Sequence, residues 1–523
     1  MRVNGLAALV AVALGGAVAP MSGVALAETS GTALAAAQCS PGGPDFDGDG
    51  CADLVVADPD ATVSGTSRAG RINVLYGAES GAGVRSLLFQ GQPGVAGSPE
   101  ADDRFGAAVR AARINNDPYT DLVVATPTED VGSANDAGII QVIFGSAEGL
   151  GGGAPSLTVR QGLHGVPGTP EAGDRFGAGL AVNTTTGESW PAPAVAYGAP
   201  GEDIGSTSNA GAAGLVAFDP ATGTVSAARA ITQDSPGIAG SVEAGDRFGA
   251  AVEVFQGPGG FFCDVTGAKG FTLVVGTPGE DFGAVRDVGM VHLARDLAKD
   301  TPLSQDAPGV GGVGEAGDQF GASLALTSFC EHDGPSHVTL AVGVPAEDIG
   351  STRDAGAAHL FRTDDDELPL PERWSASQNT TGVAGTAEAG DRFGSLVALG
   401  GPWRDDIGEP VVVGVAGEDI GAAGDAGAVQ VFGDATSDPG NGDVFVSQAH
   451  AGESPEAGDH FGAAVTTRGD YLYVGAPDDV TYSSGAVHGI LWPSLFGPEG
   501  HQFFVPGVDG VPADATRFGA ALA

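Results

Sequence analysis

A run of acidic residues near the start of the chain has the spacing of a site for a hard metal ion. Residues 45–53 read DFDGDGCAD, with carboxylates at the first, third, fifth and ninth positions. Glycines between them permit the tight turn that wraps oxygen ligands around Ca²⁺, and oxygen-only ligation favours Ca²⁺ over a transition metal. We therefore predict a calcium ion bound by Asp45, Asp47, Asp49 and Asp53, with a backbone carbonyl near Cys51 completing the shell.

A second stretch, residues 113–121, repeats this pattern in degenerate form. Asn115, Asp117 and Asp121 fit the ligand spacing, but Arg113 stands where the first carboxylate belongs. A guanidinium at that position can replace the ion with a salt bridge, so these three residues are the weaker metal candidates.

Acidic pairs recur along the chain, each after a short apolar run. They are Glu129-Asp130, Glu202-Asp203, Glu280-Asp281, Glu347-Asp348, Glu418-Asp419 and Asp478-Asp479. One interpretation is a rim that binds a cation or ligand. The other, which repetition favours, is structural: pairing with the arginines of the repeat and capping of turn amides.

The four cysteines form an even set, which suits disulfides in an exported protein. They are Cys39, Cys51, Cys263 and Cys330. Of the three possible connectivities we favour Cys39–Cys51 and Cys263–Cys330, because the last two follow the repeat phenylalanine at similar distances.

Motifs of enzymatic catalysis are not evident in the sequence. It contains no Gly-x-Ser-x-Gly elbow, no His-Glu-x-x-His pair and no phosphate-binding loop. We therefore expect no catalytic residues and a protein that is not an enzyme.

The elements that must position these residues follow from an internal repeat. The segment Glu-Ala-Gly-Asp-Arg-Phe-Gly recurs with small changes, and its phenylalanines are Phe105, Phe176, Phe248, Phe320, Phe393, Phe461 and Phe518. A second marker, a β-branched run ending in Gly-x-Pro or a variant, also has seven copies, as at 123–127 and 474–477. Each unit of about 72 residues thus holds four short strands separated by Gly, Pro and Asp turns.

Four antiparallel strands per repeat are typical of a propeller blade. The first unit, from Asp53, lacks a Phe-Gly strand, whereas the chain stops just after a lone Phe518-Gly519 strand. Donation of that strand to the first blade would close the ring and cover both edges. The sequence therefore predicts an all-β, seven-bladed propeller over residues 45–523, and the alternative is an open β-solenoid.

Charge and hydropathy limit the partners and the location. The formal net charge of −44 disfavours nucleic acid and anionic membranes as partners. An apolar run from Leu6 to Ala19 precedes Ala25-Leu26-Ala27, which indicates a signal peptide over 1–27. We expect a flexible segment over 28–44, no membrane insertion, and a secreted, extracellular, monomeric protein.

The Phe-Gly and Gly-Ala-Pro markers, together with the Asp-x-Asp-Gly-Asp-Gly-x-x-Asp loop, resemble the FG-GAP repeats of the integrin α-subunit propeller family. The resemblance covers about residues 45 to 523. It implies a seven-bladed propeller with calcium in hairpin loops, and it makes Asp45, Asp47, Asp49 and Asp53 calcium ligands. The chain departs from integrins in having one intact calcium loop and no transmembrane segment.

These features favour an extracellular, calcium-stabilised module for binding or cell adhesion, with a protein or glycan as its ligand. The alternative function is a secreted hydrolase or lyase that uses acidic residues of one propeller face. That alternative predicts a pocket where one blade breaks the repeat with unique polar groups.

Overall fold

The computed structural model describes residues 42–77, 85–183, 193–256, 271–329, 337–363, 368–400, 409–433, 435–468, 470–482, 484–492, 495, 501–508 and 510–523. All of them belong to the unit Ala35–Ala523. The predicted signal peptide, most of the 28–44 segment, and Cys39, Cys263 and Cys330 lie outside the described residues, so both disulfide pairings stay predictions. Within the described ranges, no helix combines the length and apolar character needed to cross a membrane.

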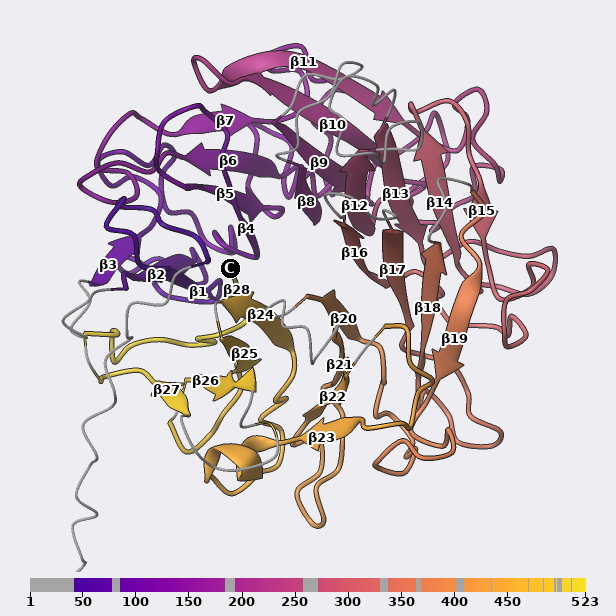
Figure 1. Cartoon of the computed structure of the whole chain (residues 1–523). Helices are drawn as coiled ribbons and strands as arrows, with labels where there is room; N and C mark the ends of the chain where they lie inside the picture. Colours follow the sequence, from indigo (N-terminus) through magenta and orange to yellow (C-terminus); the bar gives the residue numbers. More distant parts are fainter. Residues whose placement is uncertain are drawn as a thin grey trace, which may run out of the picture. The chain divides into compact units, whose positions relative to one another are not determined.

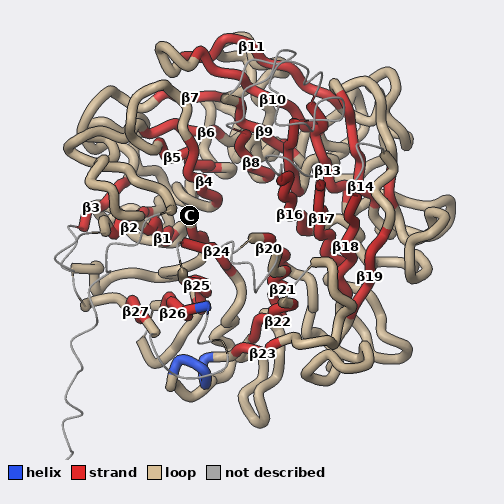
Figure 2. Tube along the Cα trace, in the orientation of Figure 1, coloured by secondary structure: helices blue, strands red, loops and turns tan. Residues whose placement is uncertain are grey.

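The strands of the described residues form seven four-stranded antiparallel sheets arranged in a ring, as Figures 1 and 2 show. The protein is therefore a seven-bladed, all-β propeller, which confirms the predicted fold class. The first three blades, each given from its inner to its outer strand, are β28 (Ala521–Leu522), β1 (Leu54–Asp58), β2 (Arg71–Leu75), β3 (Arg85–Leu88); β4 (Ala108–Ala112), β5 (Asp121–Thr126), β6 (Ile139–Ile143), β7 (Leu157–Val159); and β8 (Gly179–Asn183), β9 (Ala194–Ala199), β10 (Ala212–Asp219), β11 (Thr224–Ile231).

The other four blades have the same order. They are β12 (Ala251–Gln256), β13 (Phe271–Thr277), β14 (Met290–Arg295), β15 (Pro302–Leu303); β16 (Ser323–Phe329), β17 (His337–Val344), β18 (Ala357–Thr363), β19 (Glu372–Ala376); β20 (Leu396–Leu399), β21 (Val411–Val415), β22 (Ala428–Phe432), β23 (Val444–Val446); and β24 (Ala464–Arg468), β25 (Tyr471–Ala476), β26 (Ala486–Leu491), β27 (Gln502–Phe504). A short 3₁₀ helix, η1 (Gln448–Ala451), lies between the sixth and seventh blades.

The ring closes where the C-terminal strand joins the first blade, as the repeat register predicts. Strand β28 pairs antiparallel with β1, with Leu522 opposite Val56. The Val55 amide donates to the Ala523 carbonyl at 2.8 Å, and the Gly519 amide donates to the Ala57 carbonyl at 3.0 Å. The first blade is therefore built from both ends of the described chain, and β1 has a paired strand on each side.

The repeat phenylalanines fix each blade to the one before it. All seven have no exposed surface, and the Phe176 amide, for example, donates to the Ala137 carbonyl of the preceding blade at 2.9 Å. Glycine is required at this junction: a Cβ on Gly138, whose φ is +83°, would lie 2.5 Å from the Phe176 carbonyl oxygen. The repeat phenylalanines therefore pack between neighbouring blades.

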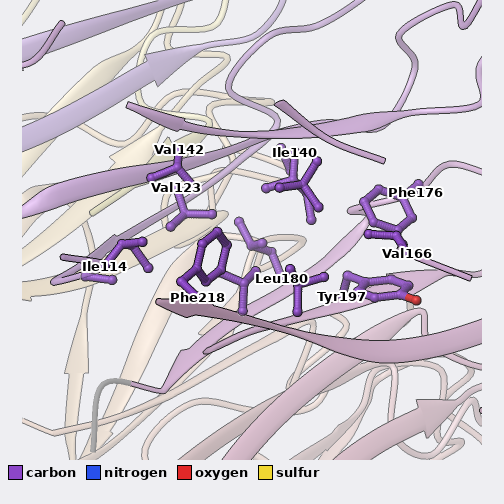
Figure 3. Close-up of a cluster of buried hydrophobic side chains, with 14 of the residues drawn as sticks. Ile114, Val123, Ile140, Val142, Val166, Phe176, Leu180, Tyr197 and Phe218 are labelled. Atoms are coloured by element: carbon purple, nitrogen blue, oxygen red, sulfur yellow. The ribbon is translucent and has the colours of Figure 1, made fainter. Parts of the chain in front are cut away.

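The hydrophobic core consists of apolar layers between neighbouring blades. Figure 3 shows the layer between the second and third blades, where Val123 and Val142 lie near Phe218. Phe176 and Tyr197 lie together at the other end of the same cluster. The ring centroids of Phe176 and Tyr197 are 4.3 Å apart. Because each sheet buries its faces against its neighbours, no blade has a complete core of its own.

Candidate metal loop and interblade contacts

The predicted calcium loop precedes β1 and brings three carboxylates together. Oxygens of Asp45, Asp47 and Asp49 all lie within 4.8 Å of one another. The Asp45 carboxylate accepts hydrogen bonds from the amides of Gly48 (2.7 Å) and Gly50 (3.1 Å). Main-chain amides therefore help to hold these side chains in a cluster of oxygen ligands.

The electrostatics of this cluster disfavour three free negative charges. Burial raises the pKa of the Asp47 carboxyl above its ordinary value, and the charges of Asp49 and Asp45 raise it further. A hydrogen bond from the Asp49 amide lowers this pKa and so offsets part of the shift. A bound cation would reverse the effect of the neighbouring charges.

Asp53, the fourth predicted ligand, is placed differently. Its carboxylate is fully buried, and its oxygens accept hydrogen bonds from the amides of Phe46 at 2.7 Å and Gly77 at 2.9 Å. It does not belong to the three-carboxylate cluster, and it closes the loop onto the end of β2. Cys51, predicted to lend a carbonyl, is buried, and its amide donates to Asp49 Oδ1 at 2.8 Å.

The degenerate loop of the second blade repeats this closure. The Asp121 carboxylate accepts from the amides of Ile114 at 2.8 Å and Gly145 at 3.0 Å, and burial raises its pKa to about 6. Asn115 accepts from the Asp117 amide at 3.0 Å, and Asp117 accepts from the Tyr119 amide at 3.0 Å. The ninth position of both loops thus has the same structural contacts.

Each acidic pair binds a glutamine of the preceding blade, through its first member, a glutamate, in five pairs and through its second member, Asp479, in the last. Sequence reasoning missed this contact. Six glutamines donate through Nε2 across the blade interfaces: Gln90 to Glu129 (2.7 Å), Gln161 to Glu202 (2.5 Å), Gln233 to Glu280, Gln305 to Glu347 (2.6 Å), Gln378 to Glu418 and Gln448 to Asp479 (3.0 Å). The sequence carries only an indirect signal, because the glutamines and the acidic residues that they bind recur at separations of 31 to 47 residues. Burial raises the pKa of each glutamate to about 7.

The second members of five pairs cap turns, which agrees with the structural interpretation. Asp130, Asp203, Asp281, Asp348 and Asp419 each accept the amide of the residue six positions later, at 2.8–2.9 Å. Among the described residues, the expected ion pairing with a repeat arginine is found between the seventh and first blades, where Arg517 binds both oxygens of Asp478 at 2.9 Å. Arg104 and Arg247 instead contact Asp60 and Asp287.

A cavity of about 470 Å³ lies between the innermost strands, and small apolar residues form most of its wall. The repeat is broken here: the fifth residue after the repeat phenylalanine is Arg110 in the second blade and Glu253 in the fourth, whereas most other blades have alanine. Burial raises the pKa of Glu253 to about 7, and the charge of Arg110 opposes this shift. Comparison of equivalent repeat positions could have found this pair.

No family model matches the chain. A segment of 116 residues, 22% of the chain, is 31% identical to the phosphatidylinositol-glycan-specific phospholipase D of Rattus norvegicus. The enzymes of that name from Mus musculus and Bos taurus are 30% and 31% identical over similar segments. The matched segment spans 14% of the length of each of these relatives.

Two solved structures align with most of the chain at low similarity. The periplasmic gluconolactonase PpgL of Pseudomonas aeruginosa covers 87% of this chain and 100% of its own, with 14% identity and a TM-score of 0.41. A eukaryotic initiation factor covers 88% of this chain and 86% of its own, with 9% identity and a TM-score of 0.32. At these scores the fold assignment depends on the strand pairing described above and not on either likeness.

Proposed function

We propose that the protein is a secreted calcium-binding propeller that acts as an extracellular binding or adhesion module for a protein or glycan. The proposal of calcium binding depends on the cluster of Asp45, Asp47 and Asp49. One carboxylate oxygen from each of these residues lies within 4.8 Å of the other two. Oxygen ligands of this kind suit Ca²⁺, which tolerates flexible coordination. Bound calcium would neutralise the cluster and supply no reactive group.

The calcium loop also joins two blades, which gives the ion a structural role. The Thr120 amide donates to the Asp45 carbonyl at 2.8 Å, and the Ser146 amide donates to the Phe46 carbonyl at 3.1 Å. An ion that orders the loop would therefore stabilise the contact between the first and second blades.

A calcium titration tests this assignment. We expect added Ca²⁺ to raise the melting temperature of the chelator-treated protein, because the ion binds the folded state alone, and Asp47→Ala to abolish the rise. Asp117→Ala, the matched change in the degenerate loop, should leave it intact. A wild-type melting temperature that ignores calcium would refute the assignment.

The binding part of the proposal follows from charge and repetition. The net charge of −44 and the recurring turn-capping aspartates favour a ligand with cationic groups. Screening on glycan arrays and against extracellular proteins, with calcium and with chelator, tests it directly. We expect a ligand whose retention weakens with added salt, and failure to retain any ligand in either condition would count against a binding module.

An enzyme remains the second candidate, and the cavity that contains Arg110 and Glu253 favours it. These residues break the repeat inside a recess, where a carboxyl with a pKa of about 7 suits proton transfer. Assays with hydrolase and lyase substrates, comparing wild type with Glu253→Gln, decide between the candidates. Turnover that disappears in the variant would support the enzyme.

A further inference from the structure

His488 on β26 is a buried imidazole without a hydrogen bond. Its side chain has no exposed surface, and neither ring nitrogen has a hydrogen-bond partner among the described residues. Burial of a polar group without a hydrogen bond lowers the stability of the folded protein. The groups around His488 therefore indicate which ligand could satisfy its ring nitrogens.

The equivalent histidines of two other blades each pair one ring nitrogen with an acid. His292 on β14 lies with Nδ1 2.6 Å from Asp300 Oδ2, and His359 on β18 lies with Nδ1 2.6 Å from Glu372 Oε1. In the sixth blade the same strand position holds Gln430, which donates to Asp443. The seventh blade therefore departs from the repeat, because neither ring nitrogen of its histidine is hydrogen-bonded to an acidic side chain of the described residues.

Two carboxylates face the unpaired ring instead. One ligand atom each from His488, Glu453 and Asp479 can be chosen so that all three lie within 4.8 Å of one another, and Nε2 of His488 is 3.7 Å from Glu453 Oε2. Other groups fix the two acids: the Tyr482 hydroxyl donates to Glu453, and Gln448 Nε2 donates to Asp479 at 3.0 Å.

We propose that His488, Glu453 and Asp479 bind a divalent transition-metal ion, with Zn²⁺ as its best representative. One imidazole nitrogen with two carboxylates is a donor set for Zn²⁺, which takes ligands at roughly 2.0–2.2 Å, and the nitrogen ligand separates the site from the all-oxygen calcium loop.

The position of the site indicates a structural clip. Glu453 belongs to the segment that follows η1 between the sixth and seventh blades, whereas Asp479 and His488 belong to the seventh (Figure 1). The ion would fasten this segment to the blade, and it would enter past Glu453, whose side chain is 22% exposed.

Zinc content measured after equilibrium dialysis tests the proposal. The untagged full chain is stripped with chelator and then dialysed against Zn²⁺ in excess calcium. The wild type should retain one zinc ion, and His488→Gln should bind zinc at least tenfold more weakly and lose it on dialysis. Glutamine occurs naturally at this strand position in the sixth blade, so the variant should fold. The matched control, His359→Gln, should retain the zinc.

Cobalt substitution gives an independent readout. Co²⁺ bound at His488 should produce a visible absorption band that Glu453→Gln alters or removes, even if His488→Gln fails to fold. Equal zinc content in wild type, His488→Gln and Glu453→Gln, or equal loss in His359→Gln, would overturn the proposal.

Discussion

Glu280 shows how single residues couple this fold to pH. The residue is 6% exposed, and its carboxyl accepts a hydrogen bond from Gln233. Burial raises its pKa from 4.5 to about 7, and the charges of Asp246, Glu243 and Asp281 add to the shift. The same contact occurs at five interfaces with a glutamate partner, so its effect on stability is repeated around the ring.

We predict that the free energy of unfolding decreases as the pH rises from about 4.5 to 7. A raised carboxyl pKa means that the folded protein keeps protons that the unfolded chain has lost. The resulting stabilisation is full at a pH below the pKa of the unfolded chain, and it is lost as the pH rises through the pKa of the folded protein. Urea denaturation in chelator over this range measures the effect.

The matched variant for this prediction is Glu280→Gln, which removes one titrating group and keeps a polar side chain opposite Gln233. Its stability should vary less steeply with pH than that of the wild type. A wild-type stability that increased from pH 4.5 to 7 would contradict the stated direction.

At the scale of the elements, the strands and their order could be predicted from the sequence. The Phe-Gly segments, the β-branched runs and the Gly and Asp turns recur in phase, and each marks a local structure with a known physical cause. Side-chain contacts between blades could not be predicted in this way, because the Gln233–Glu280 pair joins residues 47 positions apart and its geometry depends on the twist of two sheets.

The candidate site was predictable in part for the same reason. Local spacing predicts the cluster of Asp45, Asp47 and Asp49. The contacts of Asp53 depend on the amide of Gly77 at the end of another strand, which loop spacing does not specify. The sequence around His488 does not predict a metal ligand. His488 differs from His359 in lacking a hydrogen-bonded acid within the described part of the chain, and that difference depends on the folded structure.

The C-terminal strand should be as firmly integrated as the inner strand of any other blade. Phe518 is fully buried, as Phe461 is, and its amide donates to the Ser484 carbonyl at 2.9 Å. We predict that Phe518→Ala lowers the free energy of unfolding by about 3–5 kcal/mol, the usual cost of removing a buried phenylalanine.

Phe461→Ala is the control for this prediction, because it makes the same change inside an uninterrupted blade. The two variants should lose similar stability in denaturant titrations. A nearly neutral effect at Phe518 beside a large one at Phe461 would mean that the terminal strand is a loosely attached end.

At the scale of the whole molecule, ring closure and the proposed calcium loop both involve the first blade. Strand β28 pairs with β1 on one side, and the acidic loop that precedes β1 is hydrogen-bonded to the second blade on the other. The ring closes through a short strand pairing, so we expect the proposed calcium ion to add stability at this blade.

A crystal structure grown in calcium, with anomalous difference maps recorded at long wavelength, tests this account most directly. We predict seven blades, β28 paired with β1, and an anomalous peak among the carboxylates of Asp45, Asp47 and Asp49. A ring open at the first blade, or a closed ring without a peak at this loop in saturating calcium, would contradict it.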